Sequence, residues 1–357
     1  MTTTENNKTI LVTGCGGPAG VNFLKSLRIR NREDLRLIGT DCNKFHLMLA
    51  KEHLNKSYLV EPCTNISTYI NQLKNIIDKE EVDLVHPQPD VEVAVISEFR
   101  DVLGDKVFLP KKETIKTCQN KYATAFEWAR NGYDTLPIPI SDLEDIHYAY
   151  RQFNRVYWLR SAQGAGGRGS TLVKNTATAK SWIKYWRSRG AKDNFMAQKY
   201  LPGRNIAYHS VWYKGELITS QARERVEYIY PYLSPSGITG TPLVQRTIVD
   251  AKVNRVAVDS IFCIDSSPHG IFCVDLKEDE KGNPQPTEIN AGRFFTTSYF
   301  FSKASIDLNI PRANMPYMFV KLALGEEIPI GSSRDVLPEN LYWIRQIDCG
   351  EYMWMKK

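Results

Sequence analysis

Apolar and polar residues alternate in two rhythms along the first part of the chain. Short continuous apolar runs predict buried strands, and between them apolar residues recur every three or four positions, as on one face of a helix. The clearest such helix covers residues 69–82. The strand candidates are residues 9–14, 35–41, 57–62, 84–88 and 107–110. Strands that alternate with amphipathic helices predict an α/β fold with a doubly wound parallel sheet over residues 1–112.

A different unit follows this alternation. A helix that carries Lys121 precedes a strand, a glycine loop and a second strand over residues 155–173. The amphipathic helix expected at 177–190 has aromatic residues at helical spacing, which predicts that they pack in a core. These aromatic residues are Trp182, Tyr185 and Trp186.

From residue 194 onward the apolar runs become longer and more typical of β-structure. Residues 270–291 predict a hairpin that turns at Gly282 and Asn283. The segment 331–357 is partly apolar, and its pattern predicts no particular element. The expected units are residues 1–112, 113–193, 194–330 and a C-terminal extension, 331–357.

Composition narrows the class of protein. The chain has 357 residues, 42% of them hydrophobic, and its mean hydropathy is −0.37, with no apolar run long enough to span a membrane. Its polar start lacks the features of a secretory signal, and its seven cysteines contain no C-x-x-C pair, so a cytoplasmic location with reduced thiols is expected. The net charge of +6 is spread among acidic residues, which argues against a nucleic-acid partner and suits ligands that carry phosphates.

The first candidate for chemistry is the loop Ser161 to Thr171. Gly164, Gly166, Gly167 and Gly169 leave backbone N–H groups free to face an anion, and Arg160 and Arg168 add positive charge. The pattern fits a loop that cradles phosphate. A flexible hairpin tip is an equally good interpretation of these residues alone.

The second candidate is the predicted hairpin. Glu288 and Asn290 are two residues apart, so they lie on one face of a strand, and the turn brings Asp275 to that face from the neighbouring strand. Three oxygen ligands that converge in this way suit Mg²⁺. The alternative is a set of solvent-facing polar residues, but the strongly apolar flanking sequence favours the metal interpretation.

The third candidate is the opening loop. Gly14, Gly17 and Gly20 follow the first apolar run, and Asp41 ends the second, about where a ribose-binding acid lies in a dinucleotide fold. The spacing is G-x-x-G-x-x-G, which differs from the standard G-x-G-x-x-G. An NAD(P)-dependent oxidoreductase that uses this loop is therefore one alternative function.

Taken in chain order, four features of residues 8–330 resemble the ATP-grasp superfamily, and within it carbamoyl-phosphate-synthase-like carboxylate–amine ligases. They are Lys121, the strand and glycine loop at 156–173, AQKYLPG at 197–203 and TEINAGR at 287–293. The resemblance implies a doubly wound domain followed by an α+β ATP-grasp fold, whose lid or central subdomain is 113–193 and whose metal-binding subdomain is 194–330. In such proteins the opening domain helps to bind substrate, so the opening loop is better interpreted as a substrate or scaffold turn.

The resemblance also implies a nucleotide-binding set with ATP as cofactor. The expected phosphate ligands are Lys121 and Arg160, and the expected lid residues are Gly164, Gly166, Gly167, Arg168, Gly169 and Ser170. The residues expected around adenine and ribose are Gln198, Lys199, Tyr200, Leu201 and Asn205. This adenine segment departs from the family pattern, which usually has acids where Gln198 and Lys199 stand.

The same resemblance implies the metal ligands and catalytic residues. Asp275, Glu288 and Asn290 would hold Mg²⁺, with Mn²⁺ as an alternative. The residues expected to neutralise the transferred phosphoryl group are Arg293, Arg223 and Arg225.

The implied activity is a ligase that uses Mg-ATP to convert a carboxylate into an acyl phosphate, which an amine then attacks. The partners are a small-molecule carboxylate and a small-molecule amine, with no nucleic acid and no membrane, and a homodimer is compatible with the resemblance. The departures at Gln198 and Lys199 keep a second alternative open, an ATP-binding regulatory protein without turnover.

Overall fold

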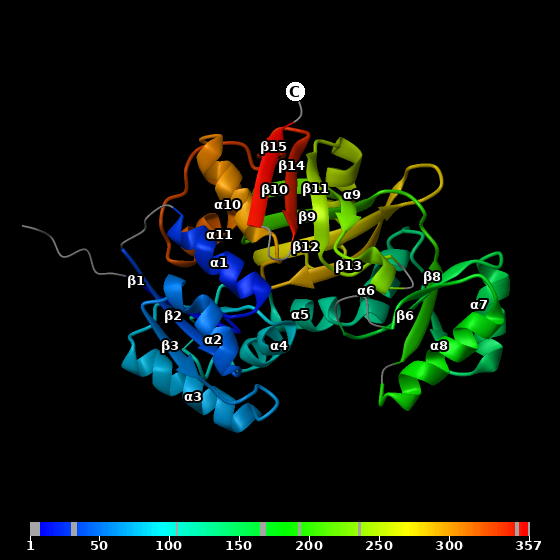
Figure 1. Ribbon diagram of the computed structural model, residues 1–357, viewed down its shortest axis with the longest axis horizontal. Helices are drawn as coiled ribbons and strands as arrows, with labels where there is room; N and C mark the ends of the chain where they lie inside the picture. Colours follow the sequence, from blue (N-terminus) through cyan, green and yellow to red (C-terminus); the bar gives the residue numbers. More distant parts are fainter. Residues whose placement is uncertain are drawn as a thin grey trace, which may run out of the picture.

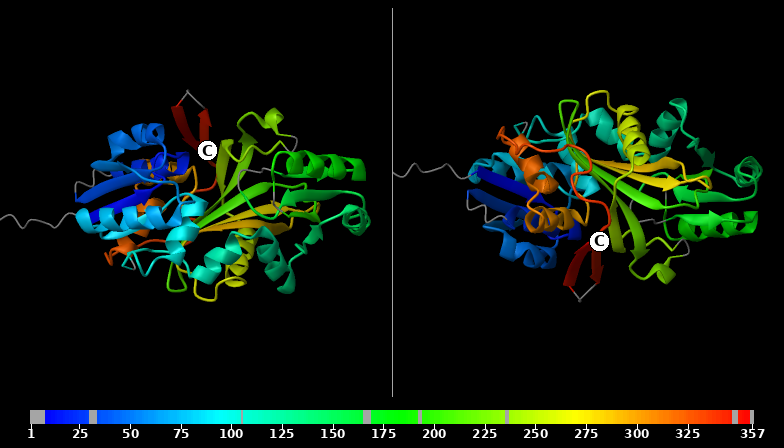
Figure 2. Two further views of the ribbon diagram at one scale, coloured as in Figure 1. Left: turned by 90° about the horizontal axis from the view of Figure 1, so that it is seen from below. Right: turned by 90° about the horizontal axis from the view of Figure 1, so that it is seen from above.

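The computed structural model describes residues 8–29, 34–104, 106–164, 169–191, 194–234, 237–346 and 350–355. Within these ranges the strands form three sheets (Figure 1). The first domain contains a parallel sheet, and a large antiparallel sheet lies in the middle of the molecule. A small sheet lies at the far side, together with the helices α7 (Leu143–Gln152) and α8 (Thr176–Ser188) (Figure 2). No helix in the described ranges is both long enough and apolar enough to cross a membrane.

The N-terminal sheet has the order β3-β2-β1-β4, and each neighbouring pair is parallel. Its strands are β1 (Lys8–Thr13), β2 (Leu35–Asp41), β3 (Lys56–Leu59) and β4 (Leu84–Pro87). Its helices are α1 (Pro18–Arg28), α2 (Lys44–Ala50), the 3-10 turn η1 (Lys51–His53), α3 (Ile66–Lys79) and α4 (Asp90–Glu98). Alternate residues of β1 pack on opposite faces, with Ile10 and Val12 in one apolar cluster and Leu11 in another. The predicted doubly wound parallel sheet is therefore confirmed.

One strand predicted in this domain is absent. Residues 107–110 make only an isolated bridge between Val107 and Val85. The next residue, Phe108, leaves the sheet and packs its ring against His269 and Phe319. A short apolar run does not reveal which core it joins, and here it is divided. Phe108 joins the core shared with the central sheet, whereas Val107 and Leu109 pack in the second cluster of the first domain.

The central sheet has the order β13-β12-β9-β10-β11-β14-β15. Its strands are β9 (Asn205–Tyr213), β10 (Glu216–Tyr228), β11 (Pro242–Ile248), β12 (Gly270–Glu278), β13 (Pro284–Ala291), β14 (Leu341–Gln346) and β15 (Gly350–Met355). The β12–β13 hairpin confirms the expected turn, where Gly282 adopts a φ of +75°. The C-terminal segment, for which the sequence predicted no element, extends this sheet through β14, and Trp343 of that strand is buried against Phe300.

Helices cover both faces of the central sheet. One face packs on α5 (Lys112–Cys118), α6 (Lys121–Arg130) and α9 (Ala251–Phe262). The other face shares a core with α1 of the first domain and with α10 (Ser298–Asp307) and α11 (Met315–Ala323). The remaining 3-10 turns are η2 (Pro231–Leu233) and η3 (Pro311–Ala313). The first domain and the central sheet are thus joined through one continuous apolar cluster.

The small sheet has the order β5-β8-β6-β7. Its strands are β5 (Ile138–Ile140), β6 (Tyr157–Ser161), β7 (Thr171–Val173) and β8 (Phe195–Lys199), and its helices are α7 (Leu143–Gln152) and α8 (Thr176–Ser188). Strand β8 pairs with β5 and β6, so pairing joins it to the segment before the expected boundary at 193/194. The division of the chain into domains stays a prediction.

The aromatic residues of α8 are only partly where the sequence placed them. Ala179 and Ile183 are the buried residues of this helix, whereas Tyr185 is 49% exposed, so core packing was wrong for Tyr185. Trp182 and Trp186 are half-buried against the edge of the small core. The rings contact one another because they flank the core-facing positions instead of occupying them: Trp182 stacks on Tyr185, and Trp186 meets both rings edge to face.

Candidate active site

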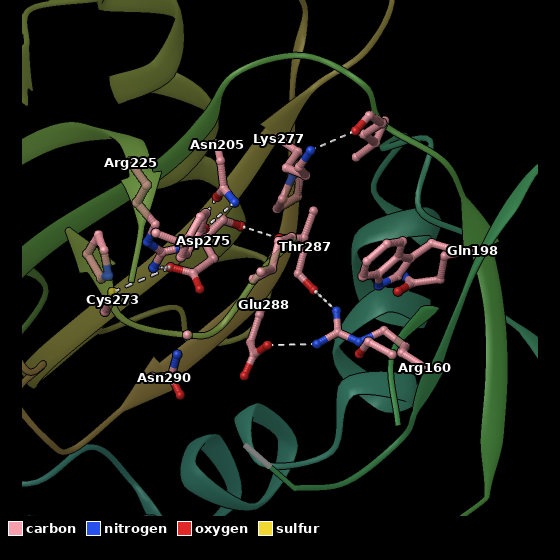
Figure 3. A pocket seen from close by; sticks show the side chains of 18 of the residues that line it. Arg160, Gln198, Asn205, Arg225, Cys273, Asp275, Lys277, Thr287, Glu288 and Asn290 are labelled. Carbon is pink, nitrogen blue, oxygen red and sulfur yellow. Dashed lines mark hydrogen bonds and ion pairs between the residues drawn. The ribbon is translucent and has the colours of Figure 1, made fainter. Parts of the chain in front are cut away.

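A cavity of about 670 Å³ lies where the small sheet faces the central sheet (Figure 3). Its walls contain most of the described residues that the sequence singled out. These are Arg160, Ser170, Gln198, Lys199, Tyr200, Leu201, Asn205, Arg223, Arg225, Asp275, Glu288, Asn290 and Arg293. Segments distant in the sequence therefore meet around one cavity.

The acidic residues of the hairpin converge as predicted. Asp275 of β12 lies directly opposite Glu288 of β13 in the ladder. Asn290 follows on the same face, and all three side chains border the cavity (Figure 3). The register set by the turn shifts by one residue between Leu276 and Asp275, and this shift places the two carboxylates directly opposite each other.

Glu288 is held by two cations. Arg160 Nη2 lies 2.7 Å from its Oε2, and Lys121 Nζ lies 3.3 Å from its Oε1. Burial alone would raise the pKa of Glu288, but the charges of Lys121 and Arg160 outweigh it and lower that pKa to about 2. Glu288 is therefore ionised throughout the physiological range.

Asp275 has its own cation. Arg225 Nη2 lies 2.6 Å from Asp275 Oδ1, and Arg225 Nη1 donates to Asn205 Oδ1 at 3.2 Å. Burial acts to lower the pKa of Arg225, yet the neighbouring Asp275 charge outweighs burial and raises it. Arg225 therefore stays charged inside the cavity wall.

Arg293 connects the site to the first domain. Its Nε contacts the carboxylate of Asp90 at the start of α4, and its Nη2 donates to Asn290 Oδ1 at 2.8 Å. The side chain of Gln88 bonds both the N–H and the carbonyl of Phe294, the residue that follows Arg293. Sequence reasoning did not identify Asp90 or Gln88, because their partners are more than 200 residues away.

The described ends of the glycine loop are pinned. Lys121 Nζ donates to the carbonyl of Gly164, and Trp182 Nε1 donates to that of Gly169 at 3.0 Å. Both glycines have positive φ, at +89° and +73° respectively. The predicted lid residues Gly166, Gly167 and Arg168 lie outside the described residues, and Lys121, Gly164 and Gly169 are not among the residues that line the cavity.

At the other end of the cavity, the exit of β8 offers backbone groups and apolar walls. Lys277 Nζ donates to the carbonyl of Leu201 at 2.9 Å, and Gln198 Nε2 donates to that of Thr135 at 3.4 Å. Trp158, Leu172 and residues 237–242 complete this end. Trp158 and Leu172 belong to the strands that the sequence predicted on either side of the glycine loop, and residues 237–240 belong to the Tyr-, Ser-, Pro- and Gly-rich segment 225–240, a predicted substrate loop. The sequence assigned no role to Lys277, which shares a strand face with Asp275.

The donor set fits a hard divalent cation. Two carboxylates and the Asn290 amide supply oxygen atoms on one face, which is the ligand type that Mg²⁺ prefers together with nucleotide phosphates. The described part of the chain contains no group of three or more His, Cys, Asp or Glu side chains that could hold a metal ion by themselves, so a metal here would need further oxygen ligands from a bound molecule.

The opening glycine loop is occupied by contacts from the protein itself. The N–H of Gly16 donates to Asp41 Oδ2 at 3.1 Å, and that of Asn43 donates to Asp41 Oδ1 at 2.9 Å, so this buried carboxylate stabilises its own loop. A Cβ placed on Gly16 would lie 2.1 Å from the carbonyl oxygen of His46. Helix α2 therefore packs directly against the backbone at Gly16. This packing favours the scaffold interpretation.

Comparisons with known proteins agree on the fold. No family model and no curated protein sequence matches the chain. Among solved structures, an L-amino acid ligase from Bacillus licheniformis is 12% identical, with 95% of this chain and 80% of that chain covered at a TM-score of 0.72. A carboxyaminoimidazole ribonucleotide synthase from Aspergillus clavatus, complexed with ATP, is 16% identical, with 96% and 82% covered at a TM-score of 0.71.

A third structure is the biotin carboxylase domain of the Hydrogenobacter thermophilus 2-oxoglutarate carboxylase, solved as a dimer with MgADP, ADP and bicarbonate. It is 15% identical, with 94% of this chain and 73% of that chain covered at a TM-score of 0.67. All three proteins have the ATP-grasp fold. This chain therefore has the ATP-grasp fold that its motifs predicted.

Proposed function

We propose that the protein is an ATP-dependent ligase that activates a small-molecule carboxylate as an acyl phosphate and joins it to an amine, with release of ADP and phosphate. The observation that carries the proposal is the Asp275–Glu288 pair, opposed across two strands in a cavity lined by arginines. The fold supports it, since similar structures were solved with ATP or with MgADP and bicarbonate.

In this proposal Asp275, Glu288 and Asn290 hold Mg²⁺, or alternatively Mn²⁺. The cation would supply charge that neutralises the nucleotide phosphates and the transferred phosphoryl group. In the ligand-free protein, Lys121 and Arg160 neutralise Glu288. Because a cation at Glu288 would replace that neutralisation, Lys121 and Arg160 become available to bind phosphate oxygens.

The remaining groups position the substrates and exclude water. Residues 164–170 would cover the phosphates, Gln198 to Leu201 would line the adenine and Asn205 would lie at the ribose. Gln198 to Leu201 and Asn205 support this assignment by lining the cavity. Arg293 and Arg225 stand on the cavity wall beside Asn290 and Asp275, where they would neutralise the phosphoryl group as it moves to the carboxylate. Nothing in this scheme requires a nucleophilic side chain, because positioning and charge neutralisation carry the reaction.

The test is a thermal-shift comparison of Mg-ATP, ATP with EDTA, and NADH. A ligand at about 100 times its Kd stabilises a protein by about 2.7 kcal/mol, which is enough to raise its Tm measurably. Because the proposed site binds Mg-ATP, only Mg-ATP should raise the Tm of the wild type. Glu288→Gln should lose this shift, and Glu280→Gln, an exposed acid in the same hairpin, should keep it. A shift with NADH alone would overturn the ligase proposal.

Turnover separates a ligase from an ATP-binding regulator. Pairs of carboxylates and amines are screened for ADP release, and at least one pair should release ADP in a manner that Glu288→Gln abolishes. Binding of Mg-ATP with no ADP release under any pair would favour the regulatory alternative. A homodimer and a cytoplasmic location stay predictions.

A further inference from the structure

One arginine of the cavity differs from the others. Arg223 of β10 is only 2% exposed, lines the cavity, and has no acidic partner within ion-pairing distance among the described residues. The other arginines that the cavity contains are compensated, Arg160 by Glu288, Arg225 by Asp275 and Arg293 by Asp90. A buried cation without an opposing charge is costly, so its retention points to an anion that arrives from outside.

The hydrogen bonds of Arg223 leave one edge free. Its Nε donates to His209 Nε2 at 2.8 Å, whereas its Nη1 is buried and has no hydrogen-bond partner among the described residues. Burial, and then the neighbouring Arg225 charge, lower the pKa of Arg223 to about 9. An anion at this edge would accept a hydrogen bond from Nη1 and would offset the burial and the Arg225 charge that lower the pKa of Arg223.

His209 fixes the direction of that guanidinium. The imidazole is fully buried on β9, its ring stacks on Phe295 with centroids 3.4 Å apart, and its Nε2 accepts the bond from Arg223. Burial, followed by the charges of Arg223 and Arg225, holds the pKa of His209 well below its usual range. The imidazole is therefore neutral, carries its proton on Nδ1, and serves as a fixed acceptor.

The register places Arg223 of β10 in the same row as Asp275 of β12, since both lie opposite Ala207 of β9. Two strand spacings put their backbones about 10 Å apart. Arg225, two residues further along β10, reaches across the same two strands and pairs with Asp275 at 2.6 Å. Because Arg225 takes this carboxylate, Arg223 keeps no acidic partner within ion-pairing distance among the described residues.

We propose that Arg223, oriented by His209, binds an oxyanion of the substrate in a subsite of its own within this cavity. The inference rests on the proposed ligase function and adds to it that the ligase substrate carries a carboxylate or phosphoryl group at this position. Arg223 contacts that group directly. His209 is a positioning residue, which acts by aiming the free edge of the guanidinium.

The experiment is a calorimetric titration of the full-length protein saturated with Mg-ADP, with inorganic phosphate in one arm and succinate in the other. The variants are Arg223→Met, His209→Phe, which keeps an aromatic ring, and His209→Gln, which keeps a side-chain acceptor. Arg246→Met is the control, because this arginine of β11 is paired with Glu224 and does not line the cavity. Arg246→Met removes one positive charge, as Arg223→Met does, but from the neighbouring strand.

We expect Arg223→Met to weaken oxyanion binding about tenfold or more, as for loss of a charge-assisted bond. His209→Phe should also weaken oxyanion binding, and His209→Gln should bind the oxyanion more tightly than His209→Phe. Affinity for Mg-ADP should stay within about twofold in Arg223→Met, and Arg246→Met should match the wild type in both measurements. Whichever anion binds identifies the group as phosphoryl or carboxylate.

Three outcomes would overturn the subsite. They are unchanged oxyanion affinity in Arg223→Met, an equal loss of Mg-ADP affinity in that variant, and no binding of either anion to the wild type. If the wild type does not bind Mg-ADP, the proposed function fails by itself. A titration of the nucleotide-free protein with the two anions then still tests the subsite. Anion binding to the wild type that is lost in Arg223→Met would support the subsite.

Discussion

At the scale of single residues, charge compensation organises the cavity. Glu288 and Asp275 are neutralised by basic side chains that the chain brings from other elements, and Arg223 is the one arginine among the described residues lining the cavity that lacks an acidic counterpart. The lowered pKa of Glu288 keeps this carboxylate ionised before any ligand binds. A site of this kind exchanges internal ion pairs for contacts to a cation and its phosphates.

The low pKa of Glu288 predicts the pH range in which its ion pairs stabilise the protein. A folded-state pKa of about 2 against an ordinary value of 4.5 means a contribution that is fully present above about 4.5 and lost as the pH falls through about 2. The difference in unfolding free energy between wild type and Glu288→Gln should be constant from pH 8 to pH 5 and shrink below about 4.5. Urea unfolding at a series of pH values measures it. A difference that already shrinks between pH 7 and pH 5 would contradict the assignment.

Packing at the opening loop predicts a large effect from one methyl group. Gly16→Ala places its Cβ 2.1 Å from the His46 carbonyl oxygen, so we expect a loss of about 1–3 kcal/mol or more in unfolding free energy. Gly17→Ala is the matched control, since its Cβ would meet nothing closer than 3.6 Å and its φ is −71°. The two variants are compared by urea unfolding. Equal stability of both variants would show that the loop has room over Gly16.

At the scale of elements, periodicity predicted what depends on local sequence. The strands β1 and β2 and the helix α3 follow from apolar spacing, and the turn at Gly282 joins the two strands that carry Asp275 and Glu288. Asp275 lies opposite Glu288 because the register shifts by one residue between Leu276 and Asp275. Two things could not be predicted. Residues 107–110 have an apolar run with no information about its partner, and Asp90 meets Arg293 across 203 residues of chain. Long-range partners depend on the packed fold, which spacing in the sequence does not encode.

The C-terminal strand β14 gives a prediction at the same scale. Trp343 is 1% exposed and packs against Phe300, so Trp343→Ala should cost about 3–5 kcal/mol. Tyr185→Ala, at an aromatic residue that is 49% exposed, should cost about 0.5 kcal/mol or less. Denaturant unfolding of the two variants provides the comparison. A small effect at Trp343 would mean that β14 is an appendage and not part of the core.

At the scale of the whole molecule, the first domain is built into the site. Residues of β1 and α1 share an apolar cluster with the central sheet, and Gln88 bonds the loop that follows β13. The Asp90–Arg293 contact continues this connection to the cavity wall. The doubly wound domain therefore supports Arg293 directly, and this is a role for the domain that needs no dinucleotide.

That support can be measured by a double-mutant cycle of Asp90→Asn and Arg293→Gln. Because the Asp90 side chain is 35% exposed, solvent weakens the pair, and we expect a coupling of about 0.5–1 kcal/mol in unfolding free energy. The pair of Lys112 and Asp101, whose carboxylate is 81% exposed at 3.6 Å, is the control and should couple by about 0.2 kcal/mol or less. If both cycles give the same small coupling, Arg293 is positioned by Asn290 and the central sheet alone. A larger coupling for Asp90 means that the first domain holds the arginine proposed to meet the transferred phosphoryl group.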